Sequence, residues 1–217
     1  FIMSLSKETQ QKKDFHHIQE VINQGMPVVL FDRVTNDVFC DKVIIDDQQA
    51  AFDAVQFFIE HRFKKIALIT TVDYVSVGTL RTDGYKKALT LNNIEVNEDL
   101  IIKIEDIENC SIKIENLIKS QKCDAIFAVN ELFAVTAIKI AAKNNLKVPE
   151  DISVIGFTDG IISQFSTPSI STVSQNGIKM GRKAAQMLID RLELEDEEDE
   201  HYKTEIIETN LIIREST

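Results

Sequence analysis

The chain has 217 residues, of which 44% are hydrophobic and 27% are charged, and its formal net charge at pH 7 is −11. This composition is typical of a globular protein with one large domain or two small lobes, and it excludes an intrinsically disordered chain. The negative charge argues against a DNA-binding surface on these residues, because phosphate contacts need clustered Lys and Arg.

Short apolar runs alternate with amphipathic segments along the whole sequence, which predicts alternating strands and helices. Strands are expected in the ranges 1–6, 27–31, 42–45, 65–70, 100–104, 125–129, 152–155, 171–174 and 203–213. Helices are expected in the ranges 14–24, 48–61, 81–92, 111–120, 132–144 and 178–192. Alternation of this kind predicts an α/β fold made of βαβ units, with parallel sheets that are covered by helices on both faces.

The segment 148–159 predicts both a buried strand and a site at its end. Pro149 ends the preceding helix because it has no backbone N–H, and the apolar, β-branched run that follows suits a strand. Gly156 lets the chain turn. Thr158 and Asp159 therefore emerge at the carboxyl end of a strand, where open α/β sheets usually bind ligands.

Polar residues follow most of the predicted strands in the same way: Ser4, Ser6, Asp32, Arg33, Thr70, Thr71, Asn130, Glu131, Thr158 and Asp159. In a parallel sheet such residues gather along one edge, where they suit a polar small molecule such as a sugar or a nucleobase. The alternative is that several of them only cap the following helices. Capping is favoured for Thr70 and Asp159, and a ligand-binding role is favoured for Asp32 and Arg81.

No catalytic residue, metal site or cofactor is expected. The sequence has no nucleophile motif and no glycine-rich phosphate loop, and no apolar run approaches the ~20 residues of a membrane-spanning helix. Cys40, Cys110 and Cys123 are expected to be free or buried thiols. The acidic run 193–200 is expected to be a solvated loop. The segment 159–168 is expected to be either a hinge or lid, or a plain surface loop.

Five segments together resemble motifs of the LacI/GalR family of transcription regulators. They are GMPVVLFDR at 25–33, Arg81 followed by Gly84-Tyr85, AIFAVNE at 125–131, LKVPEDISVIGFTD at 146–159 and TPSISTVSQ at 167–175. The resemblance implies two Rossmann-like lobes of the periplasmic-binding-protein type, joined by three crossing strands, with a small-molecule effector in the cleft. It implies a partial N-terminal lobe of residues 1–47 and 175–200 and a C-terminal lobe of residues 48–174 and 201–217. The first lobe is expected to be incomplete, because the match begins at its third strand.

The resemblance also implies roles for individual residues. Asp32 would accept hydrogen bonds from the effector, and Arg81 would reach it from the start of a helix. Asn130 would face the effector, and Ser4 and Gln175 would lie near the cleft wall or hinge. Two departures from the family pattern matter: Thr158 stands where the family usually has an acid, and Glu131 stands where it has Asp. Whether Asp159 replaces the missing acid is open at this point.

The function implied by the resemblance is that of an effector-binding and dimerisation domain of a bacterial, cytoplasmic transcription regulator. The effector is expected to be sugar-like, and DNA would be bound only through a helix-turn-helix domain that these residues do not resemble. One alternative is a secreted solute-binding protein of a sugar transporter, which has the same fold. Another is an α/β enzyme acting on a sugar derivative, although no catalytic motif supports it.

Overall fold

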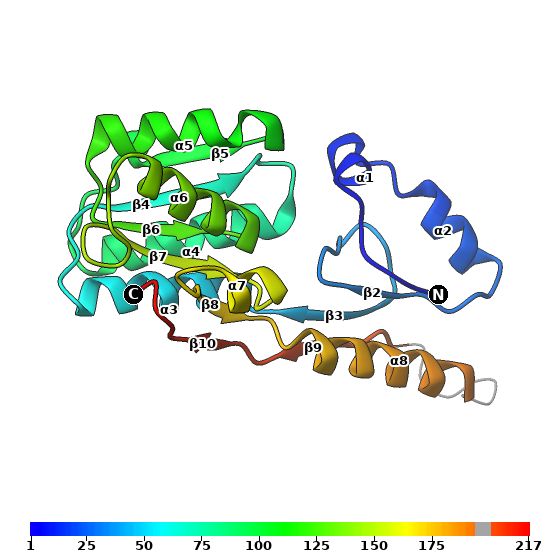
Figure 1. Cartoon of the computed structure of the whole chain (residues 1–217). Helices are drawn as coiled ribbons and strands as arrows, with labels where there is room; N and C mark the ends of the chain where they lie inside the picture. The colour runs from blue at the N-terminus through cyan, green and yellow to red at the C-terminus, as the bar shows by residue number, and fades with distance from the viewer. Residues whose placement is uncertain (194–200) are drawn as a thin grey trace. The chain divides into compact units, whose positions relative to one another are not determined.

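The computed structural model describes residues 1–193 and 201–217, and these divide into two units. Unit 1 comprises Phe1–Asp46, Tyr74–Val77 and Asn176–Glu208, and unit 2 comprises Asp47–Asp73, Gly78–Gln175 and Thr209–Thr217. Figure 1 labels the elements of both. Most of the predicted acidic loop, residues 194–200, lies outside the described residues. Within the described part, no helix is long and apolar enough to span a membrane.

Unit 1 is built on a four-stranded parallel sheet with the order β1-β2-β3-β9. Its strands are β1 (Ile2–Met3), β2 (Val29–Phe31), β3 (Asp41–Ile45) and β9 (Thr204–Ile207), and its helices are α1 (Lys7–Lys12), α2 (His16–Asn23) and α8 (Gly177–Glu193). Helix α8 packs on β2 and β3 and buries Met180, Ala184 and Met187, which recur at helical spacing on one face. These contacts and the buried β2 form the core of the unit.

Unit 2 is built on a six-stranded sheet with the order β10-β8-β7-β6-β4-β5, in which β10 is antiparallel to β8 and the other pairs are parallel. Its strands are β4 (Ile66–Thr71), β5 (Ile101–Ile104), β6 (Ala125–Ala128), β7 (Ser153–Phe157), β8 (Ser171–Ser174) and β10 (Asn210–Ile212). Its helical elements are α3 (Asp47–Glu60), α4 (Ser76–Leu91, of which the first two residues belong to unit 1), η1 (Glu98–Leu100), α5 (Ile107–Gln121), α6 (Glu131–Lys143) and α7 (Ile161–Phe165). Right-handed crossovers put α4 on one face of this sheet and α5 and α6 on the other (Figure 1). The predicted α/β class with two parallel, helix-covered sheets is confirmed.

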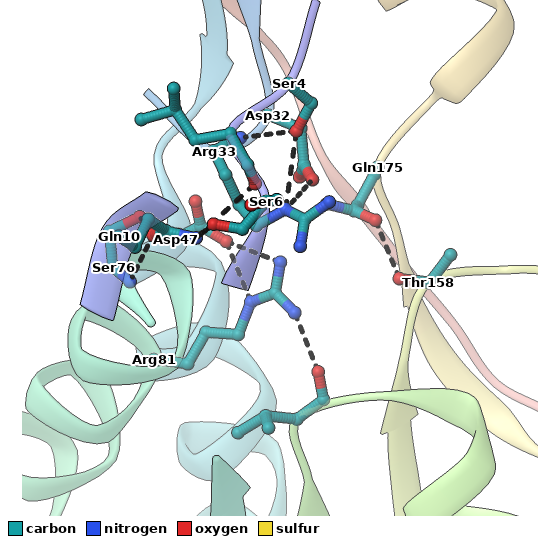
Figure 2. A network of polar contacts seen from close by, with 12 residues as sticks. Ser4, Ser6, Gln10, Asp32, Arg33, Asp47, Ser76, Arg81, Thr158 and Gln175 are labelled. Atoms are coloured by element: carbon teal, nitrogen blue, oxygen red, sulfur yellow. Dashed lines mark hydrogen bonds and ion pairs between the residues drawn. The ribbon is translucent and has the colours of Figure 1, made fainter. Parts of the chain in front are cut away.

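Helices α1, α4 and α7 show differences from the sequence prediction that bear on the site. Helix α1 was not predicted, because its six residues, KETQQK, carry no apolar face; Ser6 caps it by accepting a hydrogen bond from the Thr9 amide at 3.0 Å. Helix α4 begins at Ser76, five residues before the predicted start at Arg81. Its first amide and the Ser76 hydroxyl both donate to Gln10 Oε1 of α1, at 3.0 and 2.9 Å (Figure 2). The segment predicted as a loop, 159–168, contains the short helix α7.

The two units also differ from the predicted lobes. Residues 201–208 were expected in the C-terminal lobe, but they belong to unit 1, because β9 pairs with β3 along four residues. Residues Tyr74–Val77 were expected in the same lobe and also belong to unit 1. The local sequence of a β-strand predicts that a strand forms, but it does not predict with which of two sheets the strand pairs.

Candidate functional site

In unit 1, two of the predicted site residues meet at the carboxyl ends of β1 and β2. Ser4 follows β1, and its hydroxyl accepts hydrogen bonds from the Arg33 amide at 3.4 Å and from Arg33 Nε at 3.3 Å (Figure 2). Asp32 follows β2, and its Oδ2 lies 3.6 Å from Arg33 Nε. Arg33 was predicted only as one of the polar residues at the strand ends, without a role of its own. It is the next residue after Asp32, and the structure makes it the group that links Asp32 to Ser4.

The backbone of Asp32 is in the left-handed region, with φ of 60°. The Asp32 amide donates to Val43 O of the neighbouring strand at 3.0 Å, so the ladder continues for one residue while the chain turns away. Asp tolerates positive φ better than most residues with a Cβ. Asp32 therefore suits this turn because of its backbone conformation, independently of any role of its carboxylate in binding a ligand.

In unit 2, Thr158 occupies the corresponding place after β7, with φ of 74°. Its amide donates to Val173 O at 2.8 Å, its carbonyl accepts from Thr172 Oγ1 at 3.1 Å, and its hydroxyl donates to Gln175 Oε1 at 2.6 Å (Figure 2). A β-branched residue at positive φ is strained, and such strain persists only where neighbouring bonds hold it. The structure thus brings Thr158 and Gln175 together as a neutral hydroxyl–amide pair.

Asp159 is paired with Arg214, whose Nη2 donates to its Oδ1 at 2.7 Å. The same guanidinium donates through Nη1 to Ile170 O at 2.8 Å. Helix α7, which follows, begins at Ile161, and its N-cap residue, Gly160, provides no side-chain cap. The favoured capping role of Asp159 is therefore wrong, and its carboxylate holds a cation from the last residues of the chain.

Arg81 is buried, with 5% of its surface exposed, and it lies in the second turn of α4 and not at the helix start as predicted. Its Nε and Nη2 lie 2.8 and 2.7 Å from Asp47 Oδ1, and its Nη1 donates to Val129 O at 2.7 Å (Figure 2). The guanidinium carbon lies 3.6 Å from the centroid of the Phe157 ring, which is a cation–π contact. Asp47 was missed, although it lies two residues after the predicted strand 42–45, where it begins α3.

The capping alternative is correct for Asn130, whose Oδ1 accepts from the Phe133 amide at 2.8 Å at the start of α6. It is wrong for Thr70, whose hydroxyl donates to Gly78 O within α4 at 3.3 Å. Glu131 accepts from the amide and hydroxyl of Ser163 at 3.3 and 3.2 Å, which ties the start of α6 to α7. A Cβ at Gly160 would collide with this carboxylate, so a larger residue there would displace the end of the Glu131 side chain.

A cavity of about 570 Å³ lies elsewhere, in unit 1. It is lined by Pro27, Val28 and Asp41 at the amino ends of β2 and β3, together with Arg191 and Tyr202. Asp41 accepts two hydrogen bonds from Arg191, at 3.0 and 2.9 Å. The predicted site residues of this unit lie at the carboxyl ends of the same strands, so the cavity is not where they gather.

The three cysteines are buried free thiols, as predicted. Burial raises the pKa of Cys123 to about 11, and it also raises the pKa of Cys40 and of Cys110. Thiols of this kind are poor nucleophiles near neutral pH. Their role in the structure is therefore to fill the cores of the two units.

Comparison with known proteins gives the family. A family model described as a periplasmic binding protein-like domain matches residues 55–217. The HTH-type transcriptional regulator MalR of Clostridium butyricum is 37% identical over 180 residues, which are 82% of this chain and 52% of that protein. The chain therefore spans about half the length of this relative.

Solved structures of transcription regulators are also similar to this chain. The transcriptional regulator CelR in its cellobiose complex matches with a TM-score of 0.81 at 27% identity, covering 91% of this chain and 61% of that one. CcpA of Lactococcus lactis matches with a TM-score of 0.81 at 25% identity, covering 100% of this chain and 77% of that one. These relatives are transcription regulators, not transporter components or enzymes, and the predicted resemblance is confirmed. The chain belongs to the periplasmic binding protein-like domain family and is similar over most of its length to regulators of the LacI/GalR type.

Proposed function

We propose that this chain is the effector-binding part of a bacterial, cytoplasmic transcription regulator, and that its effector is a small sugar-like molecule. The similarity to MalR and to CelR, whose structure holds cellobiose, supports this function. The net charge of −11 argues against DNA binding by these residues, and the similarity to about half of the HTH-type regulator MalR supports DNA binding by a helix-turn-helix domain of the full-length protein. Two copies of the protein form a homodimer, as symmetric operator recognition requires.

The observation that carries the proposal is the shared geometry of Asp32 and Thr158. Each directly follows a strand, each has positive φ, and each still bonds to the next strand through its amide. Both residues are thereby turned out of their ladders at the carboxyl edge of a parallel sheet. This edge is the usual ligand-binding edge of open α/β sheets.

Each predicted residue receives a role. Asp32 accepts hydrogen bonds from effector hydroxyl groups, and Ser4 holds the Arg33 side chain beside it. Thr158 and Gln175 offer a hydroxyl and an amide, and Asn130 and Asp159 are further polar groups that follow strands of the same sheet. Arg81 has five N–H groups, of which three are used in the bonds to Asp47 and Val129, so two can reach effector oxygens.

Regulation follows from linkage. If the effector binds one state of the regulator better than another, it shifts the equilibrium between them and changes the affinity of the DNA-binding domains. DNA then changes the affinity for the effector by the same factor. The full-length regulator is accordingly expected to bind its effector with different affinities in the presence and absence of operator DNA.

The proposal is tested by thermal shift and isothermal titration calorimetry on the 217-residue chain with ribose, glucose, maltose, cellobiose, adenosine and glutamate. We expect saturable binding of at least one sugar and a rise in melting temperature. Asp32→Asn is expected to weaken this binding at least tenfold, whereas Glu60→Gln on α3 is expected to leave it unchanged. Binding of adenosine or glutamate without any sugar would contradict the proposed effector class.

A further inference from the structure

The charged residues among the predicted ligand groups of unit 2 are already neutralised. Arg81 and Asp47 form an ion pair in which 6% and 4% of the two side chains are exposed. A second acceptor, Val129 O, holds the other side of the guanidinium. Breaking a buried pair leaves an uncompensated charge, which is strongly unfavourable. The positive charge of Arg81 is therefore committed to Asp47, and only its remaining N–H groups can serve a ligand.

A second pair neutralises Asp159. Its partner Arg214 lies 55 residues further along the chain, and 18% and 16% of the Arg214 and Asp159 side chains are exposed. Thr158 directly precedes Asp159. It is neutral, whereas an acid at this position would add a charge, and its hydroxyl donates to the side-chain amide oxygen of Gln175. These residues of unit 2 thus present a ligand with neutral polar groups and with charges that are already paired inside the protein.

Unit 1 repeats the arrangement in a more exposed form. Asp32 and Arg33 are adjacent in sequence, their charges lie 3.6 Å apart, and 28% and 34% of their side chains are exposed. Glu131 in unit 2 has a different kind of partner, because its carboxylate accepts from the amide and hydroxyl of Ser163. In each unit taken by itself, any charge that these residues leave uncompensated is therefore negative, which opposes a phosphate or carboxylate group on a ligand there.

We infer that the effector is a sugar without a phosphate or carboxylate group, and is neither a sugar phosphate nor a sugar acid. The inference rests on the proposed function and narrows its ligand class. Hydroxyl groups can bond to paired carboxylates and guanidinium groups without disturbing their charge balance. A charged ligand would lose its water and find its counter-charge already engaged.

Matched ligands test the inference by calorimetry on the whole chain: glucose against glucose 6-phosphate and glucuronate, and ribose against ribose 5-phosphate. We expect the better-binding neutral sugar to bind at least about 100-fold tighter than its charged counterparts. Its Kd is expected to change less than about twofold between 50 and 500 mM salt, because no net charge is brought together. A charged member that binds tighter than its neutral counterpart would overturn the inference and leave the proposed function standing. Absence of binding by every sugar, neutral or charged, would overturn both.

A variant tests the role of pairing directly. Asp159→Asn leaves the Arg214 cation without its carboxylate, and it is expected to improve the affinity for the phosphate and uronate ligands at least about tenfold relative to the neutral sugars. Glu115→Gln is the matched control, because it removes a carboxylate from an exposed cluster with Lys119 and Lys143 on α5 and α6. The control is expected to keep the preference of the unmodified chain. If Asp159→Asn also kept that preference, charge pairing would not be the cause of the selectivity, and the inference would fail.

Discussion

Arg81 and Asp47 lie 34 residues apart in the sequence and form a buried ion pair that fixes α4 to the start of α3. The sequence alone assigns Arg81 to effector binding, and the pair gives it a structural role in addition. Removing Arg81 would leave the Asp47 carboxylate buried without its counter-charge, since only 4% of the Asp47 side chain is exposed, and this would destabilise the folded chain. Arg81 therefore supports the fold as well as any effector.

Replacing Arg81 by Met is expected to lower the free energy of unfolding by about 3–5 kcal/mol, measured by urea denaturation. The double variant Arg81→Met with Asp47→Leu is expected to recover most of this loss, since it leaves no unpaired charge. Lys86→Met, which breaks an exposed pair with Glu98, is the control and is expected to change the stability by less than about 1 kcal/mol. A single Arg81 variant as stable as the original chain would show that Asp47 finds another partner.

A second prediction concerns Gly84, which stands three residues after Arg81 in the motif that resembles the LacI/GalR family. A Cβ at this position would collide with the backbone oxygen of Gln48 and would lie 2.8 Å from Ala51 Cβ. Neither group is the end of a flexible side chain, so α4 and α3 must move apart. We expect Gly84→Ala to destabilise the chain by about 1–3 kcal/mol in chemical denaturation.

The control for Gly84 is another helical glycine. Gly181 lies within α8, and nothing lies within 4 Å of the position that its Cβ would take. Gly181→Ala is therefore expected to stabilise the chain by roughly 0.5–1 kcal/mol, because Ala restricts the unfolded chain and favours the helix. Equal effects of the two substitutions would refute the argument from close packing.

Local patterns in the sequence predicted the strands and the residues that end them, because both depend on residues that lie within a few positions of one another. Asp32 and Thr158 were found in this way. The partners of two other predicted residues could not be found in this way, since Arg214 lies 55 residues from Asp159 and Asp47 lies 34 from Arg81. Helix α1 was not predicted for a different reason. It is stabilised by the Ser6 cap and by Gln10, which bonds to Ser76, and not by an apolar face.

The strain at Thr158 gives a third prediction. Asn adopts positive φ more readily than a β-branched residue does, and a strained backbone residue costs of the order of 1–3 kcal/mol. Thr158→Asn is therefore expected to raise the free energy of unfolding by about 0.5–1 kcal/mol while weakening effector binding, because the hydroxyl that bonds Gln175 is lost. Thr90→Asn, in the helical backbone of α4, is expected to do neither. A loss of stability at Thr158 would mean that its hydrogen bonds outweigh the strain.

The buried thiols give the last prediction. With a pKa of about 11, Cys123 is ionised in about one molecule in a thousand at pH 8, and the raised pKa values of Cys40 and Cys110 act in the same direction. Reaction of the native chain with Ellman's reagent at pH 8 is therefore expected to be at least about 100-fold slower than reaction in urea, where three thiols are titrated. Ser120→Cys, at an exposed position in α5, supplies an internal standard that is expected to react at the rate of a free thiol. Rapid release of more than one equivalent from the native variant would show that at least one core cysteine is exposed by local opening of its unit.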